Sequence, residues 1–258
     1  MTRRPMMAAN WKMNKTVSEA EGYTAALIPH AADARGVDVA IFAPFLCLRV
    51  VARMTENSSV TSGAQNFYFE DSGAFTGEVS VSMLQDEGVG AGLVGHSERR
   101  EIFGETDEMV AKKTARAVEA RLLPIVCIGE TKEERDSGGM WDKISTQIKA
   151  VMENLEVGGD GIVFAYEPVW AIGTGDTASP EDAQDAIGQI RGLLRELRDD
   201  EFADTARILY GGSMKPGNVA EIMSQEDIDG GLVGGAALEV DSFVELIQAA
   251  NETAPDEE

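Results

Sequence analysis

Cysteine and histidine are scarce in this sequence of 258 residues, which contains two of each. Cys47 and Cys127 lie in separate apolar stretches, and neither has a second cysteine or a histidine at the spacing of metal ligands. A disulfide scaffold and a zinc site are therefore disfavoured. Two reduced thiols in a core are typical of a cytoplasmic protein, and we expect that location.

Long hydrophobic runs are also missing. No stretch approaches the roughly 20 uncharged apolar residues that a membrane-spanning helix needs. Arg3 and Arg4 stand near the start of the chain, but no apolar segment of a signal peptide follows them. We therefore expect neither a membrane protein nor a secreted one.

Basic residues are few, since 22 Lys and Arg stand against 45 Asp and Glu, which gives a formal net charge of −23. This charge repels nucleic acid and anionic membrane surfaces, so neither is an expected partner. The first 18 residues run against the trend, because they contain four basic residues and no acidic one. With 43% hydrophobic residues, the chain has enough apolar side chains for a large core.

Short apolar runs alternate with helical patterns along nearly the whole chain. The predicted strands are Met6–Asn10, Val37–Ala43, Val60–Ala64, Ala91–Val94, Pro124–Ile128, Ile162–Tyr166, Arg207–Tyr210 and Gly231–Val233. Helix-start patterns lie between them: Ser18 with Glu21 fits a capping box, Thr106 precedes a helix that reaches about Arg121, and Ser179 precedes one that reaches about Leu197.

This alternation predicts an α/β protein of one domain, residues 1–258, built as an eight-stranded parallel (β/α)8 barrel. Strands that are joined by helices run parallel, and eight parallel strands close a barrel with a filled interior. A doubly wound open sheet is the alternative, but it requires a glycine-rich turn after the first strand, where the sequence has Asn10–Asn14 instead. The acidic tail, residues 251–258, is predicted to fray.

In a parallel barrel, functional side chains follow the carboxyl ends of the strands. Five such segments stand out: Asn10–Lys12, Gly95–Glu98, Glu167–Pro168, Gly211–Ser213 and Gly234–Gly235. Alone, each has an ordinary explanation as a solvated charge or a turn. Together they indicate an anion site of glycine amides and a lysine, beside a base and a polarising group. That combination favours proton transfer next to the carbonyl of a small phosphorylated sugar.

Two further segments bear on this hypothesis. His96 ends an apolar strand and precedes a helix start, whereas His30, beside Pro29, is expected on the surface. Residues 168–175 begin with a proline, carry Trp170 and Ile172 and end in glycines. This pattern predicts a mobile lid that excludes water from a reactive intermediate.

Six strings of residues point to a known family. They are Asn-Trp-Lys-Met-Asn at 10–14, Gly-His-Ser-Glu-Arg-Arg at 95–100, Cys-Ile-Gly-Glu at 127–130, Ala-Tyr-Glu-Pro-Val-Trp-Ala-Ile-Gly-Thr-Gly at 165–175, Tyr-Gly-Gly-Ser at 210–213 and Leu-Val-Gly-Gly at 232–235. With these strings in this order, the chain resembles the triosephosphate isomerase family over essentially its whole length.

The resemblance implies a homodimeric barrel enzyme of glycolysis and gluconeogenesis that needs no cofactor and no metal. It implies interconversion of dihydroxyacetone phosphate and D-glyceraldehyde 3-phosphate through an enediolate, with Glu167 as the base and His96 as the neutral electrophile. Lys12 and Asn10 are implied to bind the substrate. The other implied roles are phosphate binding by the backbone of Gly173, Ser213, Gly234 and Gly235, a clamp on Glu167 made by Ile172 and Leu232, and a lid that contains Trp170.

The loop at residues 64–78 bears on assembly. It holds Phe67, Tyr68, Phe69 and Phe75, four of the 16 aromatic residues of the chain. A loop this apolar is not expected to face water. Either it folds over its own barrel, or, as the resemblance implies, it projects into a partner subunit and brings Thr76 close to Asn10 and His96 there.

Other functions would need other residues. A metal-dependent epimerase needs metal ligands on the barrel, and a Schiff-base aldolase needs a lysine within a strand, where none of the eight lysines lies. A catalytically inactive homologue that only binds a phosphate ligand is expected to have lost Asn10, Lys12, His96 and Glu167. All four are present.

Overall fold

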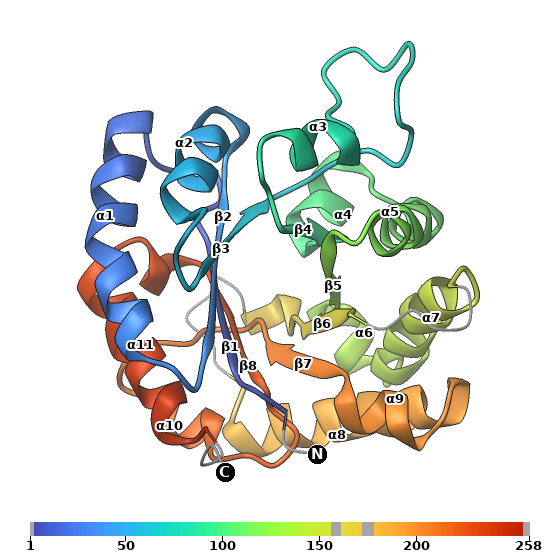
Figure 1. Ribbon diagram of the computed structural model, residues 1–258. Coiled ribbons are helices and arrows are strands. Elements are labelled where there is room, and N and C mark those ends of the chain that lie inside the picture. The colour runs from blue at the N-terminus through green and yellow to red at the C-terminus, as the bar shows by residue number, and fades with distance from the viewer. Residues whose placement is uncertain (1–2, 156–160, 172–177, 255–258) are drawn as a thin grey trace.

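The computed structural model describes residues 3–155, 161–171 and 178–254 (Figure 1). Eight parallel strands close into a barrel in which each strand pairs with its neighbours in sequence and β8 pairs with β1. The strands are β1 (Met6–Asn10), β2 (Asp38–Ala43), β3 (Val60–Ala64), β4 (Ala91–Val94), β5 (Leu123–Ile128), β6 (Val163–Tyr166), β7 (Arg207–Tyr210) and β8 (Gly230–Val233). The predicted barrel is confirmed, and the closed strand order excludes the open sheet.

Each predicted strand is present. Four have the predicted bounds, and the other four differ by one residue at their first position. Apolar runs mark these strands well because a strand of this barrel is buried on both faces, against the interior and against the helices.

Helices cover the outside of the barrel, as Figure 1 shows. They are α1 (Val17–Asp33), α2 (Phe45–Thr55), α3 (Val81–Asp86), α4 (Ser97–Phe103), α5 (Asp107–Glu119), α6 (Lys132–Asp136), α7 (Met140–Met152), α8 (Pro180–Leu197), α9 (Asp200–Thr205), α10 (Val219–Met223) and α11 (Val240–Glu252), with short 3-10 turns η1 (Val169–Ala171) and η2 (Gly235–Ala237). Thr106 and Ser179 cap α5 and α8 as predicted.

The predicted start of the first helix was wrong, and the predicted frayed tail begins too early. The capping box of α1 is formed by Thr16 and Glu19, two residues before the predicted pair, so that the Glu19 carboxylate accepts from the Thr16 N–H at 2.7 Å. At the other end of the chain, α11 continues through Glu252, past the predicted start of the frayed tail, and residues 255–258 of that tail lie outside the described residues. Asn251 is held there because its Oδ1 accepts from the N–H of Gly36 at 2.9 Å.

Apolar side chains form two layers of core. One layer fills the barrel with inward-facing residues such as Met6, Ala8 and Leu93, and the other lies between the strands and the helices. Cys47 and Cys127 are free and buried. No helix in the described part of the chain is long and apolar enough to cross a membrane.

Candidate active site

The alternation of strand residues directs two of the expected side chains into the mouth of the barrel. Met6 and Ala8 face the interior from β1, and Asn10 continues their alternation. Val163 and Ala165 do the same in β6, and Glu167 is the next residue in that series. Asn10 is 4% exposed and Glu167 only 2%, so both polar groups are withdrawn from bulk water.

Glu167 meets the β4–α4 segment at two points. Its Oε2 accepts a hydrogen bond from the N–H of Ser97 at 2.8 Å, and its Oε1 lies 3.1 Å from Nε2 of His96. The predicted base and the predicted electrophile, 71 positions apart in the numbering, are therefore in direct contact.

His96 is the residue that caps α4. Its Nδ1 accepts from the N–H of Glu98 at 3.2 Å, so the ring proton is on Nε2, the nitrogen that faces Glu167. The sequence His-Ser-Glu thus fixes both the place and the tautomer of the ring. A donor at Nε2 is what polarisation of a carbonyl oxygen requires.

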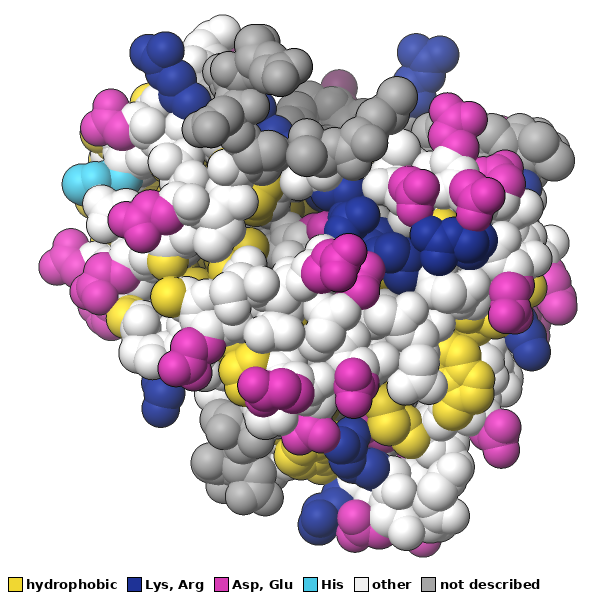
Figure 2. Space-filling view, turned by 90° about the horizontal axis from the view of Figure 1, so that it is seen from below, with side chains coloured by type: hydrophobic (Ala, Val, Ile, Leu, Met, Phe, Trp, Pro, Cys, Tyr) yellow, Lys and Arg dark blue, Asp and Glu magenta, His cyan; other side chains and the backbone are white. Residues whose placement is uncertain are grey.

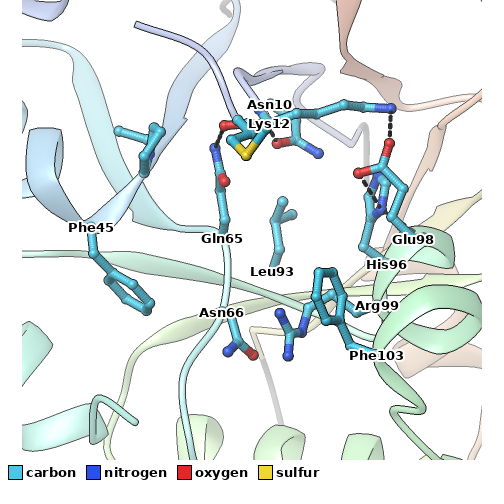
Figure 3. Close-up of a pocket in the computed structure, with 13 residues that line it drawn as sticks. Asn10, Lys12, Phe45, Gln65, Asn66, Leu93, His96, Glu98, Arg99 and Phe103 are labelled. Carbon is cyan, nitrogen blue, oxygen red and sulfur yellow. Dashed lines mark hydrogen bonds and ion pairs between the residues drawn. The ribbon is translucent and has the colours of Figure 1, made fainter. Parts of the chain in front are cut away.

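Lys12 has a left-handed backbone with φ of 51°, an uncommon conformation for a residue other than glycine. Its N–H donates to Oδ1 of Asn10 at 3.0 Å, and its carbonyl accepts from the side-chain amide of Gln65 at 3.0 Å (Figure 3). The Gln65 amide also donates to the carbonyl of Phe42 at 2.9 Å. Gln65 was missed from the sequence, and its place just after β3 was the only signal for it.

Glu98 lies in the predicted segment Gly95–Glu98, but sequence reasoning gave it no role of its own. Its Oε1 lies 2.7 Å from Nζ of Lys12, and its own backbone N–H orients His96 (Figure 3). Both members of the pair are part-exposed, at 29% for Lys12 and 43% for Glu98, so water screens their attraction. An anion that binds to the Lys12 ammonium group would have to compete with Glu98 for it.

Glycines allow the backbone to pass close to Glu167 and Lys12. A Cβ on Gly129 would overlap the carbonyl oxygen of Glu167, and a Cβ on Gly211 would come within 2.8 Å of the Cγ of Glu167. A Cβ on Gly234 would lie 3.2 Å from Cε of Lys12. Ser213 follows β7 and accepts from Asn218 at 3.0 Å through its carbonyl. The segments after β1, β6, β7 and β8 therefore converge on one end of the barrel.

Part of the predicted lid and clamp falls on residues that the structure does not describe. Ile172 and Gly173 lie outside the described residues. Trp170, in η1, donates from Nε1 to Oε1 of Glu130 at 2.9 Å. Leu232 is buried in the interior layer of the barrel. The clamp on Glu167 stays a prediction.

Burial shifts several pKa values close to the site. It raises the pKa of the Glu130 carboxyl, against the effect of hydrogen bonds from Trp170 and Tyr166. It raises the pKa of Tyr210 to about 12. Burial, followed by the nearby Glu167 carboxylate, holds the pKa of the Cys127 thiol well above its usual value. Cys127 is therefore an unreactive thiol of the core.

The described residues give little support to a metal-dependent epimerase or a Schiff-base aldolase. Among the described residues, no group of three or more His, Cys, Asp or Glu side chains is placed to share a metal ion. No strand contains a lysine. The most buried lysine, Lys113, belongs to α5 and is held by Glu105 at 3.1 Å and by Asn66 at 2.8 Å.

A hollow of about 320 Å³ opens beside these groups (Figure 3). Asn10, Lys12 and His96 lie on its wall. Much of the remaining lining is apolar and includes Met13, Phe45, Leu93 and Phe103. Met13 and Phe103 are 96% and 67% exposed, which is unusual for side chains of this size.

Comparisons with known proteins agree with the motifs. A family model described as triosephosphate isomerase matches residues 5–250. The chain is 68% identical to the triosephosphate isomerase of Rubrobacter xylanophilus over 96% of this chain and 98% of that protein. It is 49% identical to that of Carboxydothermus hydrogenoformans and 48% identical to that of Alkaliphilus metalliredigens, over 96% and 95% of this chain and 99% of each relative. The chain belongs to the triosephosphate isomerase family.

Proposed function

We propose that the chain is an isomerase that interconverts dihydroxyacetone phosphate and D-glyceraldehyde 3-phosphate, a reaction of glycolysis and gluconeogenesis. The observation that carries the proposal is the contact of 3.1 Å between Glu167 and His96, next to Lys12, in a chain 68% identical to an enzyme of that name. The catalytically inactive alternative finds no support, because Asn10, Lys12, His96 and Glu167 are all present and lie at one end of the barrel.

The arrangement supports the following proton transfer. Glu167 takes a proton from the carbon next to the carbonyl, and the electrons of that C–H bond form a C=C bond while the carbonyl oxygen becomes negative. Nε2–H of His96 and the ammonium group of Lys12 stabilise this oxygen in the enediolate. Glu167 then returns the proton to the neighbouring carbon, and a proton moves between the two oxygens to leave the isomeric carbonyl.

A rearrangement must precede the transfer. Glu167 is bonded to Ser97 and lies against His96, so one movement of its carboxylate away from the β4–α4 segment frees both the base and the imidazole N–H. Backbone amides of Gly173, Ser213, Gly234 and Gly235 hold the phosphate in this proposal, with Ile172 and Leu232 as the apolar clamp and Trp170 in the lid. Exclusion of water protects the enediolate from side reactions.

A coupled spectrophotometric assay tests the proposed activity in each direction, with each triose phosphate as the starting compound. We expect turnover at nanomolar enzyme without added metal or cofactor, and unchanged turnover after treatment with a chelator. Absence of turnover at micromolar enzyme would remove the proposal.

The loop at residues 64–78 supports a homodimer. Phe67, at its base, is fully buried in its own subunit, but residues 70–78 are exposed and project from the body of the molecule between β3 and α3 (Figure 1). Tyr68 stacks on Phe69 with ring centroids 4.2 Å apart and lies 4.7 Å from Phe75. In the proposed dimer, the aromatic loop of one subunit enters the apolar hollow of the other subunit. Thr76 then lies close to the active site of that second subunit.

Light scattering tests the dimer. Deletion of Phe69–Gly73 is expected to give a monomer with much reduced activity, because the hollow loses its occupant and the site loses its support. Replacement of Ser72 by Ala, on the exposed tip, is the control and is expected to leave a dimer. A fully active monomer would show that the loop serves its own barrel.

The cytoplasmic location stays a prediction, consistent with two free thiols.

A further inference from the structure

Lys15 lies close to the site in sequence but outside the hollow that contains Lys12. It lines a separate hollow of about 480 Å³ with Tyr23 of α1 and with Leu238 and Glu239, which follow η2. Its backbone φ is 75°, a left-handed value that is unfavourable for every residue except glycine. A half-buried lysine in a strained conformation needs contacts that hold it there.

Those contacts join the segment after β1 to the segment after β8. The ammonium group of Lys15 donates to the carbonyl of Leu238 at 2.8 Å, and it lies over the rings of Tyr23 and Trp11, 4.6 and 5.4 Å from their centroids. The hydroxyl of Tyr23 donates to the carbonyl of Ala237 at 2.8 Å. Two consecutive carbonyls after β8 are thus held by side chains from one neighbouring segment.

The same two residues hold the glycines of the phosphate site. The N–H of Ala237 donates to the carbonyl of Gly234 at 2.9 Å, and the N–H of Leu238 donates to the carbonyl of Gly235 at 3.1 Å. Two short chains of hydrogen bonds therefore run in parallel. One links Tyr23 through Ala237 to Gly234, and the other links Lys15 through Leu238 to Gly235.

Lys12 also lies close to the segment after β8. Its Cε would lie 3.2 Å from a Cβ on Gly234, so the lysine and the glycine turn are in close proximity. A change in the separation of the two segments alters the distance between the Lys12 ammonium group and the glycine amides. Both are assigned to the substrate's charged groups in the proposed function.

We propose that Lys15 is a positioning residue that fixes the Gly234–Gly235 turn relative to Lys12 and so sets the affinity for the phosphate group of the substrate. The proposal rests on the proposed function. Lys15 does not touch the substrate in this proposal, and Glu167 and His96 follow other strands, β6 and β4, so proton transfer in the bound complex depends little on it.

Lys15→Met tests this assignment, because methionine keeps most of the length and the apolar stem but removes the donor. We expect KM, and the inhibition constant of inorganic phosphate, to rise about fivefold to tenfold, part of what loss of a hydrogen bond to a charged group costs. We expect kcat to change less than about threefold. Lys15→Arg keeps a charged donor and is expected to restore most of the affinity.

Two more variants separate positioning from general destabilisation. Lys15→Gly removes the donor and relieves the left-handed strain, so it should fold well and show the same rise in KM. Thr16→Ala removes the cap of α1 and should lower Tm without a change in KM. An unchanged phosphate affinity in Lys15→Met and Lys15→Gly, or an equal loss in Thr16→Ala, would overturn the proposal.

Lys12→Met, measured in parallel, separates this inference from the function on which it rests. If Lys12→Met weakens phosphate and the Lys15 variants do not, the site stands and only the role of Lys15 falls. If none of these variants changes phosphate affinity, the phosphate is not bound at this end of the β1 segment, and the proposed site fails with it.

Discussion

Arg191, at the amino end of the barrel, donates hydrogen bonds to two carboxylates and three backbone carbonyls, all between 2.7 and 2.9 Å. Lys12 lies at the carboxyl end. Among the described residues, its ammonium group pairs with one carboxylate, that of Glu98, at 2.7 Å. The Arg191 side chain is 5% exposed, whereas the side chains of Lys12 and Glu98 are 29% and 43% exposed. The two ends of one barrel therefore hold positive charge in different ways.

The amino end is a closed network. Asp229, which precedes β8, accepts from Arg191 at 2.7 Å, from Arg3 at 2.5 Å and from the N–H of Ile208 at 2.7 Å. Asp38, the first residue of β2, pairs with Arg4 and Arg207 at 2.8 and 2.6 Å in a more exposed extension of this network. Donors and acceptors there satisfy one another, so we assign this end to stability.

The carboxyl end keeps its polar groups available. Glu167, His96 and Lys12 face the mouth of the barrel, and their present partners are groups that a substrate can displace. Buried polar groups with replaceable partners are costly for folding and are found where function requires them. A change at the carboxyl end should therefore affect catalysis, and a change at the amino end should affect unfolding.

Glu167→Gln is the strongest test of this difference. The amide keeps the size of the side chain but cannot accept the proton, so we expect kcat to fall by about 10²- to 10⁴-fold, the usual cost of losing a general base. The inhibition constant of phosphate should stay within a few-fold, because the proposed function assigns the phosphate to backbone amides and not to Glu167. Tm should change little. A variant with near-native kcat would show that another residue is the base.

Asp229→Ala should produce the opposite pattern. It leaves Arg191 buried without one of its two carboxylates, and breaking a buried pair costs about 3–5 kcal/mol of unfolding free energy. Urea unfolding measures this loss, and KM and kcat of the folded fraction should be unchanged.

Asp204→Ala is the matched control for that experiment, because it breaks the exposed pair between Arg195 and Asp204. Exposed pairs contribute roughly 0–1 kcal/mol, so its urea midpoint should barely move. Equal losses in Asp229→Ala and Asp204→Ala would mean that the amino-end network is not a source of stability.

Lys12→Met comes next in expected size. In the proposed function the lysine meets both the bound dianion and the charge that develops on the oxygen, so KM should rise and kcat should fall together, by about 10- to 100-fold in kcat/KM. Lys132→Met, which removes an exposed lysine of α6, is the control. An unchanged KM in Lys12→Met would show that the glycine turns alone bind the anion.

The sequence predicted the strands and most of the site for the same reason. Asn10, His96 and Glu167 directly follow buried apolar runs, and the ends of parallel strands meet by necessity. The contacts that Gln65 and Glu98 make with Lys12 could not be predicted this way, because they join positions 53 and 86 residues apart and depend on side-chain direction. The start of α1 was misplaced because Thr16–Glu19 and Ser18–Glu21 fit the same capping pattern.

The amino-end network was missed for a different reason. Arg191 continues an amphipathic helical pattern in α8, and nothing local distinguishes it from the exposed Arg195 one turn later. Its burial follows from the packing of α8 over the start of β7 and β8, where Asp227 and Asp229 supply the matching charges. Local sequence patterns carry no information on such pairs.

The smallest expected effect concerns the surface that surrounds both ends. Acidic side chains are spread over the face drawn in Figure 2, and 45 acidic residues against 22 basic ones repel one another across the molecule. Salt shortens the screening length from about 10 Å at 0.1 M to about 3 Å at 1 M, which weakens this repulsion, while close contacts such as Arg191–Asp229 are buried and little affected. We expect Tm to rise by a few degrees between 0.05 and 2 M KCl, since about 1 kcal/mol shifts Tm by roughly 2–4 °C in a chain of this size. The net charge also repels the anionic substrate at long range, so kcat/KM should fall little over the same range, or rise at first. Melts in sucrose at matched osmolality separate screening from solute exclusion. A Tm that is flat or falls with KCl would show that the acidic surface does not oppose folding.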